Sequence, residues 1–131
     1  MSILLSNDDG VYAHGLKIAQ EYLSTIDDVF VVAPDRERSA SSHSITLESP
    51  LRLIEISKNV YSASGTPVDC IKLGLKEVFK DKKIDAVVVG INPGANTSAS
   101  IFYSGTVSAA REASLNGLPA IAISINSPRP Q

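Results

Sequence analysis

Apolar residues along this chain occur in two patterns that predict two kinds of element. Short runs made almost entirely of apolar residues, each bounded by turn-forming residues, are typical of strands buried on both faces of a parallel sheet. These runs lie at residues 3–5, 29–33, 86–89 and 118–124. Between them lie longer segments that predict helices, at residues 15–26, 67–79 and the alanine-rich 107–115. Because strands alternate with helices, the pattern predicts an α/β fold with a mostly parallel sheet and flanking helices.

The details of the pattern predict which side chains are buried. The first helix is expected to bury a stripe of Leu16, Ala19, Leu23 and Ile26. The second helix begins at Pro67, with Thr66 as its N-cap, and is expected to bury Val68, Ile71, Leu75, Val78 and Phe79. Cys70 lies within this second helix, with no histidine near it in sequence, and is interpreted as a packing residue. In residues 45–63, apolar and polar residues alternate instead of forming apolar runs. This predicts two short antiparallel strands joined by a turn.

An acidic pair, Asp8 and Asp9, directly follows the first predicted strand. Ligands of open α/β sheets bind beyond the carboxyl ends of the strands, so the pair lies at the expected ligand edge. Two adjacent carboxylates repel each other, and a pair at the end of a hydrophobic strand therefore suggests a bound cation or a carboxyl group with a raised pKa. An ordinary Asp-Gly turn with solvated acids, made with Gly10, explains the same residues.

Polar groups recur at two further points of the same edge. The third strand run ends in GINPGAN, in which Asn92 and Asn96 offer oxygen ligands and amide donors. The third helix starts at Ser104, Gly105 and Thr106, and free N–H groups with two hydroxyls at a helix start can hold a phosphate. The alternative interpretation is that GINPGAN forms a simple turn and that residues 104–106 form an ordinary helix cap without a ligand. The serine-rich segment 35–44 is either a surface loop or a loop beside the site.

Composition limits the classes of function. The 131 residues, of which 44% are hydrophobic, suit a single globular domain, and the net charge of −2 gives no general attraction to nucleic acid or anionic membranes. We therefore expect neither kind of partner. One cysteine excludes an internal disulfide, and no apolar run resembles a signal peptide or a membrane span, which suggests a cytoplasmic setting.

Known motifs narrow the chemistry further. The sequence contains no GxGxxG for a dinucleotide, no GxxxxGK[ST] for a P-loop and no DxD pair. A phosphate receiver domain would need an aspartate after a later strand, where this chain has Asn92. Carboxylates, amides, hydroxyls and a phosphate-binding helix start at one edge favour a metal-dependent phosphatase.

Five motifs resemble the survival protein E (SurE) family of 5′-nucleotidases. They are NDDG at 7–10, VVAPDRERSASSHSIT at 31–46, GTPVDC at 65–70, GINPGAN at 90–96 and YSGTVSAARE at 103–112. The resemblance implies a Rossmann-like α/β core and a nucleoside monophosphate phosphatase that depends on one divalent metal ion, Mg²⁺ or Mn²⁺. Some members also act on exopolyphosphate.

The resemblance also implies roles for particular residues. It places catalytic and metal-ligating carboxylates at Asp8 and Asp9 and further metal ligands at Ser39 and Asn92. It places phosphate contacts at Asn96, Ser104, Gly105 and Thr106, and gives His43 a supporting role. The family continues with a C-terminal half that this chain lacks, so residues 1–131 correspond to the N-terminal phosphatase core. The expected state is a homo-oligomer, a dimer or tetramer; the alternative is an inactive nucleotide-binding or structural module.

Overall fold

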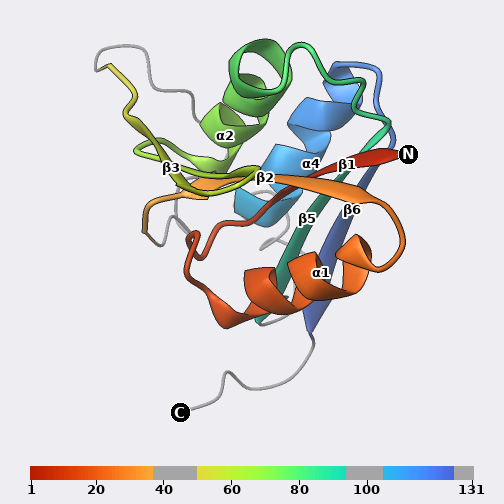
Figure 1. Cartoon of the computed structure of the whole chain (residues 1–131). Coiled ribbons are helices and arrows are strands. Elements are labelled where there is room, and N and C mark those ends of the chain that lie inside the picture. The colour runs from red at the N-terminus through yellow and green to blue at the C-terminus, as the bar shows by residue number, and fades with distance from the viewer. Residues whose placement is uncertain (37–49, 94–104, 126–131) are drawn as a thin grey trace.

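The chain folds around one mostly parallel sheet (Figure 1). A computed structural model describes residues 1–36, 50–93 and 105–125, whose strands form a six-stranded sheet in the order β3-β4-β2-β1-β5-β6. Five strands pair in parallel: β1 (Ser2–Ser6), β2 (Asp28–Pro34), β4 (Val60–Ala63), β5 (Ala86–Pro93) and β6 (Ala120–Ile125). The edge strand β3 (Leu53–Ser57) pairs antiparallel with β4, so the predicted α/β class and hairpin are both confirmed.

Helices cover the two faces of the sheet unequally. Figure 1 shows α1 (His14–Ser24) on one side of the sheet and α2 (Pro67–Leu73) with α4 (Gly105–Leu115) on the other.

Within the described residues, no helix is long and apolar enough to cross a bilayer.

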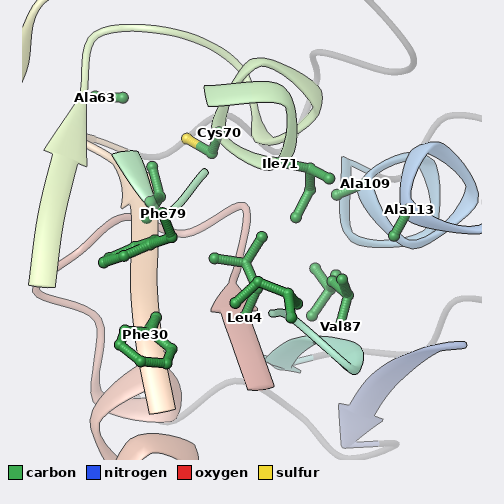
Figure 2. Close-up of a cluster of buried hydrophobic side chains, with 12 residues drawn as sticks. Leu4, Phe30, Ala63, Cys70, Ile71, Phe79, Val87, Ala109 and Ala113 are labelled. Carbon is green, nitrogen blue, oxygen red and sulfur yellow. The ribbon is translucent and has the colours of Figure 1, made fainter. Parts of the chain in front are cut away.

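The core on the α2–α4 face is the larger of two hydrophobic clusters. Figure 2 shows Leu4 and Val87 from the central strands pointing toward Ile71 of α2 and Ala109 of α4. Cys70 lies fully buried in this cluster, as predicted for a packing residue. The smaller cluster lies under α1 and contains Ile3, Leu5, Leu16, Ala19, Val31, Ala33, Val60 and Val88. Successive residues of β1 and β2 therefore alternate between the two clusters, as a strand buried on both faces requires.

The N-terminus of α2 is fixed by a reciprocal cap. The Thr66 hydroxyl accepts a hydrogen bond from the Asp69 N–H at 3.1 Å, and the Asp69 carboxylate accepts one from the Thr66 N–H at 2.9 Å. Both side chains are buried, so the capping box satisfies backbone donors that water does not reach. The prediction of Thr66 as the N-cap is confirmed. By contrast, the N-cap of α1 is Ala13, whose side chain cannot accept a hydrogen bond.

Two details of the helix predictions are wrong, although the predicted extent of the second helix, 67–79, agrees to within one residue with the helical residues 67–78. The expected single helix at 67–79 ends at Leu73 and continues as a π-helical segment, η1 (Gly74–Val78), closed by a hydrogen bond from the Phe79 N–H to the Gly74 carbonyl at 3.0 Å. The Phe79 ring then packs against Phe30 at 4.8 Å between ring centroids. The other error concerns Ile26: α1 ends at Ser24, and Ile26 is 58% exposed rather than part of the buried stripe.

Candidate functional site

The strand order creates a switch point between β1 and β5. From β1 the chain builds outward through β2 and β4, and then returns to add β5 and β6 on the opposite side of β1. At such a point the connections leave in opposite directions, which opens a crevice beyond the carboxyl ends of the two strands. Asp8 and Asp9 follow β1, and Asn92 lies at the end of β5. The fold therefore brings these three predicted ligands to the same crevice edge.

A tight turn holds the acidic pair in place. The Asn7 side chain accepts a hydrogen bond from the Gly10 N–H at 3.2 Å and donates one to the Gly10 carbonyl at 2.9 Å, and so closes the turn that contains Asp8 and Asp9. Gly10 has φ of 113°, a conformation that favours glycine, and a Cβ there would lie 3.3 Å from the Arg36 backbone. Asn7 thus positions Asp8 and Asp9. Asn and Gly both favour turns, so the string NDDG is a signal from which this turn could have been predicted.

The carboxylates of the pair are withdrawn from bulk water. Asp8 is only 2% exposed and Asp9 is half-buried. The Oδ1 atom of each is buried and accepts no hydrogen bond, while both residues take part in other interactions. Burying charge is costly unless it is paired or coordinated. The reading of these residues as solvated turn acids is therefore wrong for Asp8.

A β-bulge in β5 determines which way Asn92 faces. Val89 pairs with Ala122 and Asn92 pairs with Ser124, so three steps on β5 match two steps on β6. In a regular strand, residues two positions apart face the same side of the sheet. Here Val89 belongs to the α2–α4 cluster, while Ile91 packs on the α1 side, so the bulge has reversed the order of the faces. Asn92 is thereby placed on the α4 side, like its partner Ser124.

Glycines permit two close backbone approaches at this bulge. A Cβ on Gly90, whose φ is 149°, would lie 2.6 Å from the Ile123 carbonyl oxygen. A Cβ on Gly15, in the first turn of α1, would overlap the carbonyl oxygen of Ile91. The start of α1, which continues from the acidic turn, therefore rests directly on the backbone next to Asn92. Gly15 was missed by the sequence analysis, because only the packing of α1 on β5 gives it a role.

The predicted phosphate-binding helix start lies only partly within the described residues. α4 begins at Gly105, followed by Thr106, so both residues occupy its first turn, where N–H groups lack helical partners. α4 packs on β5 and β6, beside the switch point. Ser39, His43, Asn96 and Ser104 lie outside the described residues. The predicted end of this helix is confirmed: Gly117 has φ of 80°, and the Leu118 N–H bonds to the Ala113 carbonyl at 3.2 Å.

The described donors suit a hard divalent cation. Asp8 and Asp9 offer carboxylate oxygens and Asn92 an amide oxygen, which are the ligand types preferred by Mg²⁺ and Mn²⁺ rather than by softer metals. Within the described parts of the chain, no three His, Cys, Asp or Glu side chains lie together in a way that could hold a metal ion. A site here would therefore depend on mixed oxygen donors.

Comparisons with known proteins identify the family. The model of the family described as Survival protein SurE matches residues 3–131. This chain belongs to the SurE family. The resemblance inferred from the five motifs is thereby confirmed.

Relatives agree over almost the whole chain. The protein named 5′-nucleotidase SurE from Aliivibrio fischeri is 51% identical over 125 residues, which are 95% of this chain and 49% of that protein. The protein of the same name from Anaeromyxobacter dehalogenans is 52% identical over 130 residues, 99% of this chain and 51% of that protein. The crystal structure of the SurE protein from Aquifex aeolicus matches with a TM-score of 0.94 at 42% identity, covering 98% of this chain and 52% of that one. This chain spans about half the length of the SurE relatives it matches.

Proposed function

We propose that this chain is a divalent-metal-dependent phosphomonoesterase that hydrolyses nucleoside 5′-monophosphates. The observation that carries the proposal is the acidic pair at the carboxyl end of β1, with Asp8 buried and Asp9 half-buried, held by Asn7 beside the switch point. Membership of the SurE family supports it, because the relatives compared above are named 5′-nucleotidases.

The metal would be held by Asp8, Asp9 and Asn92, with Ser39 as a further ligand. When bound, Mg²⁺ or Mn²⁺ supplies positive charge next to the phosphoryl oxygens and makes a nearby water easier to deprotonate. The bulge that turns Asn92 toward α4 supports its inclusion in the ligand set.

The phosphate would be bound at the start of α4. The N–H groups of Gly105 and Thr106, with side chains of Ser104 and Asn96, would donate to the phosphate oxygens, and the positive end of the helix dipole favours the dianion. These donors would stabilise charge that grows on the phosphoryl oxygens as the ester bond breaks. The buried setting of Asp8 would strengthen its own interaction with the metal, because little water screens that carboxylate.

Release of inorganic phosphate from a panel of nucleoside 5′-monophosphates, with Mg²⁺, Mn²⁺ or EDTA, tests the proposal. We expect turnover with metal and none with EDTA. Asp8→Asn and Asp9→Asn should each lower kcat by about 100-fold or more, because each removes a charged ligand. Neither variant should unfold more easily in urea without metal, since each relieves repulsion between adjacent carboxylates. Polyphosphate, included in the panel, tests the further activity that the family resemblance implies.

Asp28→Asn provides a matched control. Asp27 and Asp28 form a second adjacent acidic pair, but Asp28 pairs with Ser2 at the opposite edge of the sheet, where the strands begin. This variant should keep full activity. Undiminished hydrolysis in EDTA would remove the metal from the mechanism. Nucleotide binding without turnover under every metal condition would instead favour a nucleotide-binding module.

A further inference from the structure

Ser6, the last residue of β1, carries a hydroxyl that is both buried and unpartnered. The residue is 0% exposed, and its Oγ atom makes no hydrogen bond within the part of the chain that the structure describes. A buried polar group without a partner costs free energy, and native structures keep few of them. The Ser6 hydroxyl therefore indicates a hydrogen bond that the protein makes only when something else is bound.

The side chains that flank Ser6 in the sheet are apolar. Leu4 and Leu5 belong to opposite clusters, so the alternation of β1 places Ser6 on the α2–α4 face with Leu4. Ser6 pairs with Val89 of β5, and the register between β1 and β2 places it beside Val32. Both valines are fully buried members of the α2–α4 cluster. None of these flanking side chains can donate or accept a hydrogen bond.

Polar side chains lie ahead of Ser6, in the turn at the carboxyl end of β1. Asp8 follows two positions later, and two residues of chain span at most about 7 Å. The Ser6 hydroxyl can therefore reach the Asp8 carboxylate after a side-chain rotation or through one bridging water. Asp8 is buried too, so a hydrogen bond between the two residues would be shielded from competing water.

We propose that Ser6 is a positioning residue for Asp8, an inference that rests on the metal-binding part of the function proposed above. Its hydroxyl donates a hydrogen bond to the Asp8 carboxylate when that carboxylate binds a divalent cation. Carboxylates that bind metals are usually oriented by such a bond from a neighbouring group. A hydroxyl suits this role because it donates to the carboxylate and adds no positive charge that would repel the cation.

The variant Ser6→Ala separates this role from a purely structural one, because the two roles predict opposite changes in stability. Mn²⁺ affinity is measured from the electron paramagnetic resonance signal of free Mn²⁺, and stability from the midpoint of urea unfolding in EDTA. We expect Ser6→Ala to weaken Mn²⁺ binding by about 10- to 100-fold, the usual effect of losing a hydrogen bond behind a metal ligand. In EDTA the same variant should unfold at an equal or higher urea concentration, because it removes an unsatisfied polar atom.

Two further variants serve as controls. Ser6→Thr keeps the hydroxyl on a residue that suits a strand, and should bind Mn²⁺ within about threefold of the original chain. Ser62→Ala removes the hydroxyl of another buried strand serine, on β4, which lies two strands away from β1. Its Mn²⁺ affinity should equal that of the original chain.

The outcomes distinguish this proposal from the one on which it rests. Weaker Mn²⁺ binding by Ser6→Ala with undiminished stability supports the positioning role, even if the phosphate-release assay finds no hydrolysis. Nucleotide hydrolysis by the original chain, with Mn²⁺ affinity equal in Ser6→Ala, overturns the positioning role alone. Lower stability of Ser6→Ala in EDTA also overturns it, because the hydroxyl would then hold the fold together without metal. Absence of Mn²⁺ binding by the original chain overturns both the metal site and this role.

Discussion

On the α2–α4 face of the sheet, two helices and η1 bury a cluster that extends from Phe30 on β2 to Val89 on β5. On the other face, α1 is the helix that the described residues provide, and much apolar surface there stays exposed. Ile121 is in register with Val88 of the α1-side cluster, yet it is 58% exposed, and Ile123 on the same face is exposed too. The two sides of one sheet thus differ in how completely they are covered.

The helices that cover the faces differ in the same way. α2 begins with a buried capping box and is linked to α4 by an ion pair between Lys72 and Glu112 at 3.1 Å. α1 begins without a side-chain cap and borders an open groove. This contrast suggests that the α2–α4 face supplies most of the stability, while the α1 face keeps surface for ligands or other chains.

The largest effect is expected from removing the centre of the covered face. Leu4→Ala deletes a fully buried side chain of the α2–α4 cluster and should lower the free energy of unfolding by about 2–5 kcal/mol. Ile121→Ala removes a side chain of similar size from the open face and should cost less than about 1 kcal/mol, because that side chain is already in water. Urea unfolding of both variants measures the difference. Equal losses would show that the contrast between the faces is not energetic.

A smaller effect on stability is expected from removing the N-cap of α2 and from adding one to α1. Thr66→Ala removes the α2 cap and should lower the free energy of unfolding by about 0.5–2 kcal/mol. Ala13→Ser supplies α1 with the hydroxyl that it lacks and should raise stability by up to about 1 kcal/mol. Thermal unfolding of each variant, compared with the original chain, tests both predictions. An Ala13→Ser variant with lower stability would show that the start of α1 is held by contacts that the new hydroxyl disturbs.

The smallest effect on stability, but a visible effect on assembly, is expected at β6. We expect the apolar face of Ile121 and Ile123 to promote self-association of the 131-residue chain, because exposed apolar patches commonly form interfaces. The double variant Ile121→Lys with Ile123→Lys should change the free energy of unfolding by no more than about 0.5 kcal/mol. Light scattering should show a smaller mean mass than for the original chain. An unchanged mass would exclude this face as the site of self-association.

Most of the fold could be predicted because its strands are local features of the sequence. The run at residues 29–33 is buried on both faces, and no distant contact is needed to recognise it. By contrast, η1 leads into Phe79, whose ring contacts Phe30 and Tyr61, and contacts between such separate segments cannot be read from a local pattern. The bulge at Gly90 depends on the register between β5 and β6, which only the folded sheet defines.

For the candidate site, the sequence predicted where several residues lie, while their roles stay predictions. The acidic pair could be found from its place after a strand, and the geometry of β1 supports that interpretation. Asn92 was identified by type and position, but the direction in which it faces required the bulge. The role of Asn7 required the hydrogen bonds to Gly10. Ser39 was assigned through the family resemblance alone, since the composition of its segment equally suits an ordinary surface loop.

The close approach of Gly15 to the Ile91 carbonyl has a consequence for the entropy of ligand binding. Since α1 continues from the acidic turn and presses on β5 backbone to backbone, the segments carrying Asp8 and Asn92 cannot shift independently without a clash. The acidic turn and the end of β5 are thus fixed relative to each other once the chain has folded. A ligand that bridges them would therefore lose little affinity to the ordering of the chain, which is the advantage of a preorganised site.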